Sequence, residues 1–485
     1  MSHNLKQKAT SSLKWSAIER LATQLVQLIV MLVLARILGP HAFGLIGMLA
    51  VFIAVSQVFV DSGLSSALIR KLDRSELDYS TAFYFNIGIA LACYTLLYFC
   101  APYIAHFYQQ PELTPLTRVL ALVVIINSFG IIQRTKLSIK MDFKTQAKAS
   151  LIAVTISSLT AFCLAYYNFG VWSLVAQTLV YATFNVIFLN MLHRWLPMLS
   201  FSSESFRHLF GFGSKLMLSG LIDSIYQNIY QIVIGKKFNV LDVGYFTQAN
   251  QLIKTPATTM TAIIQRVTYP MLSSIQNDEN RLNAAYLLTL RLSAVVIFPI
   301  LFGLGTVADP LIPELLGIEW KPAALLASIL AMGFLLYPIH AINLNYLQVK
   351  GRSDLFLKLE VIKKVLITII LIITIPYGIN AICIGIVIQS YIALFINTYY
   401  NGRIGNLSGI IQLKALLPIW LIAIAACSIA WLITHLVTLS TWFSITMTIT
   451  IAIAIYIISI RLLQKDLYQY LILNILPKKL IKNHE

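Results

Sequence analysis

The sequence predicts an all-α integral membrane protein with about 14 transmembrane helices and a central cavity. Of its 485 residues, 58% are hydrophobic and only 11% are charged, whereas soluble globular chains carry about 25% charged residues. The mean hydropathy is +0.79. Apolar stretches such as "LITIILIITI" and "SITMTITIAIAIYIISI" recur along the whole chain, and a helix needs about 20 mostly apolar residues to cross a bilayer.

The first apolar segment predicts a retained transmembrane span rather than a signal peptide. It is long, it contains Glu19 and Arg20, and no small-residue cleavage site follows it. Charges and Gly/Pro breaks then divide the chain into fourteen expected spans: 13–38, 41–69, 79–108, 114–133, 147–167, 171–192, 213–235, 243–270, 282–308, 322–349, 355–375, 380–400, 413–436 and 442–463.

Lys and Arg are distributed unevenly between alternate connections. With the N-terminus in the cytoplasm, the inner connections are rich in both residues, and the outer connections hold only Lys236, Lys237 and Lys321. Because cytoplasmic connections keep the positive charges, this pattern predicts that both termini lie in the cytoplasm. It also accounts for most of the +17 net charge, so no nucleic-acid partner is expected.

An internal repeat divides the chain. A shift of 200 residues places "LARILGPHAFGLIG" on "VIGKKFNVLDVGYF", with Gly44 on Gly244 and Gln27 on Gln227. Chance similarity among apolar helices is the alternative explanation. The repeat predicts four parts: a six-helix lobe at 1–200, a second at 201–405, two added helices at 406–463 and an interfacial basic tail at 464–485. Because six spans per copy is even, the repeats are expected to be parallel, related by a pseudo-two-fold axis along the membrane normal.

Nothing in the sequence indicates catalysis. It has no Walker A sequence, no GxGxxG at a strand-helix turn and no large segment outside the membrane. The five cysteines lie inside apolar segments, without a CxxC pair or a histidine at ligand spacing. We therefore expect a protein that is not an enzyme and that has no cofactor, metal site or disulfide.

Ionisable and polar residues inside the expected spans are the candidate functional groups, because charges at membrane depth usually face a cavity or a partner. Lys254 and Arg291 lie about 18 Å and about 14 Å of helix from the nearer ends of their spans. They pair either with acidic residues or with an anionic substrate. The candidate substrate-binding residues are Lys254, Arg291, Lys215, Arg20, Gln24, Gln27, Gln57 and Gln227, and the candidates for ion or proton coupling are Asp61, Glu19 and Asp223. His340 with Asn343 and Asn345 is better explained by hydrogen-bonded helix packing.

Three stretches carry a resemblance to a known family. They are "LARILGPHAFGLIGM", "DSGLSSALIRK" and "LIDSIYQNIYQIVIGKKFNVLDVGYFTQANQLIKTPATTMTAIIQRVTYPMLSSIQND". The chain resembles the polysaccharide exporters of the multidrug/oligosaccharidyl-lipid/polysaccharide (MOP) superfamily, especially Wzx-type flippases of the colanic acid exporter branch.

The resemblance implies a bacterial inner-membrane flippase for O-antigen, exopolysaccharide or capsule synthesis. Such a protein moves undecaprenyl-pyrophosphate-linked oligosaccharide units to the periplasmic leaflet by alternating access, coupled to an ion gradient. The implied partners are this lipid, membrane lipids, and the polymerase and chain-length machinery of the same pathway. The cationic cavity of the family would correspond here to Arg20, Lys215, Lys254 and Arg291. Alternatives are an exporter of lipid II or of drug-type amphiphiles, and a membrane glycosyltransferase or polymerase.

Overall fold

The computed structural model describes residues 2–405, 407–437 and 440–475, with the helical backbone alone for residues 2–22 and 473–475. Within these ranges the chain is helical, and none of the described residues forms a strand. The packing of the chain forms two compact units, Met1–Thr247 and Gln248–Glu485. The predicted fold class, all-α and membrane-spanning, is confirmed.

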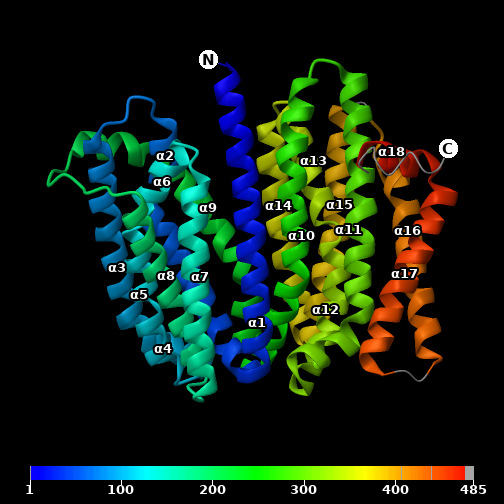
Figure 1. Ribbon diagram of the computed structural model, residues 1–485, viewed down its shortest axis with the longest axis horizontal. Coiled ribbons are helices and arrows are strands. Elements are labelled where there is room, and N and C mark those ends of the chain that lie inside the picture. The colour runs from blue at the N-terminus through cyan, green and yellow to red at the C-terminus, as the bar shows by residue number, and fades with distance from the viewer. Residues whose placement is uncertain (1, 406, 438–439, 476–485) are drawn as a thin grey trace. The chain divides into compact units, whose positions relative to one another are not determined.

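Unit 1 is a bundle in which the longest helices run side by side (Figure 1). Extensive contacts join α7 to α8 and α1 to both α7 and α9. The unit contains α1 (Ser2–Asp61), α2 (Leu64–Arg70), α3 (Glu76–Tyr108), α4 (Leu113–Leu120), α5 (Leu122–Ser128), α6 (Ile131–Ile139), α7 (Phe143–Tyr166), α8 (Trp172–Leu192), α9 (Ser203–Lys237) and the first residues of α10 (Val240–Ser274).

Unit 2 is a second helical bundle that includes the two added C-terminal helices. These two, α16 and α17, pack on each other and against α11 (Figure 1, orange and yellow-green). The unit contains the rest of α10, α11 (Glu279–Leu316), η1 (Ile318–Trp320), α12 (Lys321–Phe334), α13 (Tyr337–Val349), α14 (Ser353–Thr374), η2 (Ile375–Tyr377), α15 (Ile379–Ile404), α16 (Gly409–His435), α17 (Thr441–Leu463) and α18 (Lys465–Ile475).

All fourteen predicted spans fall on helices of the described chain. Ten helical stretches there are long and apolar enough to cross a membrane, and one of them, Thr23–Arg70, holds two predicted spans. The remaining three spans are α9, α10 and α14, whose polar and charged residues lower their hydropathy. The lobe boundary at residue 200 stays a prediction. The predicted basic tail is described only as far as α18, and residues 476–485 lie outside the described chain.

The first two predicted spans are joined by a tight break inside α1. Gly39 has φ 69° and ψ 176°, and Pro40 follows it. Glycine is favoured there because it tolerates positive φ, while proline suits the first turn of the next helix, where its missing N–H is no loss. The predicted Gly-Pro turn is confirmed. The corresponding break between α9 and α10 lies at residues 238–239, 200 positions later.

The two copies of this helical break contact each other inside unit 1. A Cβ atom on Gly44 would lie 2.0 Å from the carbonyl oxygen of Val240, and a Cβ atom on Gly244 would lie 2.1 Å from that of Pro40. The two contacts are equivalent under the 200-residue shift. Small residues allow membrane helices to approach until their backbones touch, so the glycines permit this crossing.

A short linker, residues 193–202, follows α8 and is held against the start of α3. The Trp195 indole N–H donates to a Glu76 carboxylate oxygen at 2.7 Å, and the Met198 backbone N–H donates to the Ser80 hydroxyl at 2.8 Å. These bonds hold the connection between the predicted repeats on unit 1.

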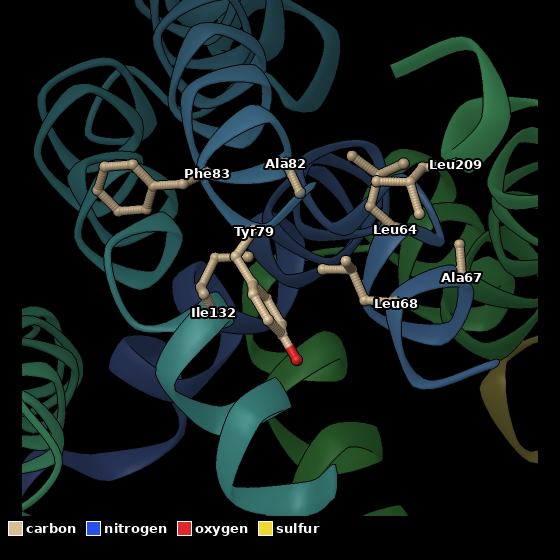
Figure 2. Close-up of a cluster of buried hydrophobic side chains, with 8 residues drawn as sticks. All are labelled: Leu64, Ala67, Leu68, Tyr79, Ala82, Phe83, Ile132 and Leu209. Carbon is tan, nitrogen blue, oxygen red and sulfur yellow. The ribbon is translucent and has the colours of Figure 1, made fainter. Parts of the chain in front are cut away.

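Beneath the linker, α2, α3, α6 and α9 share one apolar cluster (Figure 2). Trp195 packs on its edge, 5.6 Å from Phe83 between ring centroids. Burial of this surface fixes the beginning of α9 in unit 1. The buried members are Leu64, Ala67, Leu68, Tyr79, Ala82, Phe83, Ile132 and Leu209.

Candidate functional site

A polar stripe runs along α9 in unit 1. Lys215, Ser219, Asp223 and Gln227 follow one another at intervals of four residues, and all four are exposed. Residues four apart lie on one face of a helix. Exposed charges on a membrane-spanning helix face water, protein or a ligand rather than hydrocarbon. The stripe ends at Gln231, which is buried.

Sequence reasoning found Lys215, Asp223 and Gln227 on α9 but missed Ser219. The signal for Ser219 was present, because it fills the gap in the four-residue spacing between Lys215 and Asp223. A serine is small and weakly polar, and it is common in helices as a packing residue, so its residue type alone carried little information.

The polar residues of α1 are in two kinds of surroundings. Gln24 is partly buried and Gln27 is exposed. The Gln57 side-chain carbonyl accepts a hydrogen bond from Asn127 of α5 at 3.2 Å, and an Asp61 carboxylate oxygen accepts one from the Ser65 hydroxyl of α2. Gln57 and Asp61 are therefore bonded inside unit 1. A substrate or coupling role for any of the four stays a prediction.

The other two predicted residues of α1 are Glu19 and Arg20. They lie in the part of α1 for which only the backbone is described, so the positions of their side chains are outside the described structure.

In unit 2, α10 carries Lys254 on a row of hydroxyl and amide residues. Lys254 is partly buried and has no ion-pair partner among the side chains that the structure describes. The Thr258 hydroxyl donates to the Lys254 carbonyl at 3.0 Å. Further along the row, the Gln265 amide donates to Asn345 of α13 at 3.4 Å. One end of the row is thus bonded to its own unit, while the Lys254 ammonium is left for another partner.

Arg291 of α11 faces a different part of unit 2. Its guanidinium donates to the Gln464 side chain, between α17 and α18, at 3.0 Å. Both residues line a pocket of about 400 Å³ together with Lys414 of α16. Sequence reasoning missed Lys414 and Gln464 at this site because they come from helices far along the chain, and no short-range pattern connects them to Arg291.

A buried hydrogen-bond network joins four helices of unit 2. The Tyr286 hydroxyl of α11 lies 2.6 Å from the Asn343 side-chain oxygen of α13 and 2.9 Å from that of Gln412 in α16. It also accepts from the Asn401 amide of α15 at 3.0 Å. All four side chains are buried. Bonds of this kind hold helices together where the surroundings supply no water to replace them, and here they fasten α16 to the bundle.

We expect Tyr286→Phe to destabilise unit 2 by about 1 to 2 kcal/mol, because it removes the hydroxyl that donates to one of the two buried oxygens, of Asn343 or Gln412, and that accepts from the Asn401 amide. The measurement is the thermal unfolding midpoint of the purified protein in detergent. Tyr166→Phe is the matched control, since the Tyr166 side chain is 80% exposed. Equal midpoints for both variants would contradict the prediction.

His340 is also bonded within unit 2. Its Nε2 lies 3.1 Å from the Ser390 hydroxyl, and its Nδ1 lies 3.2 Å from the Asn397 amide nitrogen. The Ser390 hydroxyl donates to the Gly333 carbonyl at 2.9 Å, so it accepts from Nε2–H, and Nδ1 accepts from Asn397. This pattern defines one neutral tautomer. The contacts support helix packing as the role of His340.

Potential metal ligands are scattered over the structure. Throughout the described ranges, no group of three or more His, Cys, Asp or Glu side chains is arranged to hold a metal ion.

Polar stripes on otherwise apolar spans, in a chain with an internal repeat, are the features of a secondary transporter. Solved structures share the fold. The lipid II flippase MurJ, in an inward closed conformation, matches with a TM-score of 0.75 at 16% identity, over 93% of this chain and 99% of that one. An inward-facing multidrug resistance MATE family transporter of the MOP superfamily matches with a TM-score of 0.63 at 19% identity, over 81% and 98%. The fold is that of MOP transporters.

The chain belongs to the family described as polysaccharide biosynthesis protein, whose model matches residues 33–325. Similar curated proteins include the teichuronic acid biosynthesis protein TuaB of Bacillus subtilis (strain 168), 25% identical over 73% of each chain. The succinoglycan biosynthesis transport protein ExoT of Rhizobium meliloti (strain 1021) is 26% identical over 67% of this chain and 65% of its own. The lipopolysaccharide biosynthesis protein WzxC of Escherichia coli (strain K12) is 25% identical over 86% and 85%. The resemblance identified in the sequence is confirmed.

Proposed function

We propose that this chain is a flippase that moves undecaprenyl-pyrophosphate-linked oligosaccharide units from the cytoplasmic to the periplasmic leaflet of a bacterial inner membrane. The observation that carries the proposal is the exposed polar stripe on α9, a helix that the sequence predicts to span the membrane, in a chain of the polysaccharide biosynthesis family. A sugar chain needs a hydrophilic route through the bilayer, and a polar helix face can supply one.

The charges within the spans suit the headgroup of such a lipid. The pyrophosphate is anionic, and Lys215 is exposed on α9 while Lys254 is partly buried on α10 without a described acidic partner. Lysine binds phosphate as a point charge. In this proposal Lys215 of unit 1 and Lys254 of unit 2 are each a candidate for binding the pyrophosphate, and Gln27 and Gln227 are candidates for bonding the sugar hydroxyls. The remaining predicted residues, Arg20, Gln24, Gln57 and Arg291, are secondary candidates.

Transport needs a source of free energy and later steps that consume the transported lipid. We propose alternating access driven by an ion gradient, with Asp223, Asp61 and Glu19 as the candidate coupling carboxylates. In the proposed topology both termini lie in the cytoplasm, because this orientation puts the connections rich in Lys and Arg on the cytoplasmic side. The products would supply O-antigen, exopolysaccharide or capsule assembly, where the polymerase and chain-length machinery of the same pathway act next.

The test is transport by the purified full chain in liposomes. A fluorescent undecaprenyl-pyrophosphate-linked oligosaccharide is incorporated, a membrane-impermeant quencher measures the outer-leaflet fraction, and mass spectrometry follows the lipid. We expect protein-dependent leaflet exchange with unchanged lipid mass. Elongation of the glycan would instead identify a glycosyltransferase or polymerase, and no exchange above protein-free liposomes would refute the proposal.

The likeness to MurJ favours one second candidate, a lipid II exporter, and the MATE likeness favours a drug-type exporter. The same liposomes distinguish them. Faster exchange of lipid II than of the oligosaccharide lipid would support the first, and competition by hydrophobic cations would support the second.

A further inference from the structure

Unit 1 contains an apolar groove that is lined by none of its candidate substrate-binding residues. It lies between the second half of α1, α3 and α9, and its volume is about 780 Å³, within the range of about 300 to 1,000 Å³ that ligand sites occupy. Its lining includes Val55, Phe59, Ala92, Leu96, Cys100 and Tyr103. Among the non-aromatic residues of the lining, only Ser56 carries a hydroxyl group. The groove therefore suits a hydrocarbon ligand.

Close packing shapes one end of the groove. The Phe52 and Tyr108 rings meet edge to face with centroids 6.4 Å apart. A Cβ atom on Gly235 of α9 would lie 2.8 Å from the Tyr108 ring, so α9 is seated directly on α3 there.

A cation lies at the same end. The Lys236 ammonium donates to the Phe107 carbonyl at 2.8 Å and lies 4.5 Å from the centroid of the Phe107 ring, which lines the groove. Lys236 and its neighbour Lys237 are both exposed. The charge distribution predicts that this is the outer, periplasmic end. An apolar groove with an exposed cation at its end is complementary to a lipid with an anionic headgroup.

The length of the groove discriminates between lipids. Its α3 lining extends from Ile89 to Phe107, which is about 27 Å of helix at 1.5 Å per residue. The hydrocarbon core of a bilayer is about 30 Å thick, so one leaflet supplies about 15 Å. The acyl chains of an ordinary phospholipid fill one leaflet, whereas this groove continues well into the next. A long isoprenoid chain matches it better.

We propose that this groove binds the isoprenoid chain of a polyprenyl phosphate lipid, with the lipid phosphate at Lys236. The choice of lipid rests on the proposed function, since a polyprenyl carrier is the lipid part of that substrate. The lining of the groove shares no residue with the polar stripe of α9. It holds the carrier chain at the outer end of unit 1 while the glycan headgroup is outside the membrane.

Two native cysteines allow the site to be tested in the full chain. Cys93 and Cys100 line the groove, and Cys163 on α7 is exposed elsewhere. We expect undecaprenyl phosphate, at about tenfold its Kd, to slow alkylation of Cys93 and Cys100 by a lipid-soluble maleimide about tenfold, because only the empty groove reacts. Cys163 alkylation should not change. Equal protection by phosphatidylglycerol would indicate a general lipid surface and overturn the proposal, as would no protection.

A matched pair of substitutions tests occupancy by direct binding. Ala92 lines the groove. Its neighbour Leu91 is exposed and does not line the groove. We expect Ala92→Trp to weaken undecaprenyl phosphate binding about tenfold by native mass spectrometry, whereas Leu91→Trp leaves it unchanged. Lys236→Gln should weaken the binding of undecaprenyl phosphate but not the binding of the corresponding uncharged polyprenol. Equal affinities for the two tryptophan variants, both with wild-type thermal midpoints, would overturn the proposal.

These assays separate the groove from the proposed function. If undecaprenyl phosphate protects Cys93 and Cys100 but the liposomes show no glycolipid exchange, the groove stands and the flippase proposal fails. If exchange is normal while the cysteines stay unprotected and Ala92→Trp binds as wild type, the flippase proposal stands and the groove proposal fails.

Discussion

Gly44→Ala and Gly244→Ala should each lower the stability of the protein by about 3 kcal/mol, at the upper end of the usual cost of overpacking. The added methyl group would lie 2.0 Å from the Val240 carbonyl oxygen in one variant and 2.1 Å from the Pro40 carbonyl oxygen in the other. Neither obstacle is a flexible side chain that can rotate away. The backbones of the two helices must separate, and the packing around them is lost as they do so.

The control for both variants is Gly88→Ala. Gly88 lies inside α3, and an added Cβ there would meet nothing within 4 Å, so the higher helix propensity of alanine should leave the protein as stable as before or slightly more stable. The measurements are the thermal midpoint and the monodisperse fraction in detergent. A midpoint for Gly44→Ala equal to that of Gly88→Ala would show that the crossing is looser than described.

Lys254→Glu should reduce transport of the oligosaccharide lipid about 100-fold without preventing membrane insertion. The Lys254 ammonium has no acidic partner among the described side chains, so reversing its charge breaks no described ion pair of the fold. If it binds the pyrophosphate, the reversal replaces attraction by repulsion. Losing one partner of a desolvated charge pair costs about 3 kcal/mol, and this corresponds to about two factors of ten.

Lys321→Glu makes the same charge change at the exposed first residue of α12 and should leave transport near the wild-type rate. Lys254→Arg should retain most of it, since the positive charge remains. Initial rates in liposomes with matched protein content give the comparison. Full activity of Lys254→Glu would show that Lys254 does not bind the pyrophosphate and would leave Lys215 as the principal candidate for that role.

The number and order of the spans could be predicted from the sequence because hydropathy and charge act locally along the chain. All fourteen predicted spans fall on helices, including α9, α10 and α14, which fail a simple apolarity test. The interruptions were harder to predict. The expected span at 322–349 is two helices, α12 and α13, meeting just before Pro338, and a proline in an apolar run can either kink or end a helix.

Candidate residues on a single helix could also be predicted from the sequence, because a four-residue spacing is visible in one short segment. Lys215, Asp223 and Gln227 were found in this way. Hydrogen-bond partners from distant segments could not be predicted. The hydrogen bonds from Arg291 to Gln464 and from Asn127 to Gln57 depend on tertiary packing, and no local pattern encodes them. The roles proposed for Lys254 and the other candidates stay predictions.

The crossing of Gly44 and Gly244 follows the rule of a two-fold homodimer. Each glycine meets the backbone of the residue four positions before its counterpart, as residue i meets j and j meets i in an isologous interface. A chain with one copy of the repeat would carry this self-complementary surface and would need a second molecule to cover it. Fusing two copies makes the contact intramolecular, so that its formation no longer depends on protein concentration, as assembly of separate subunits does.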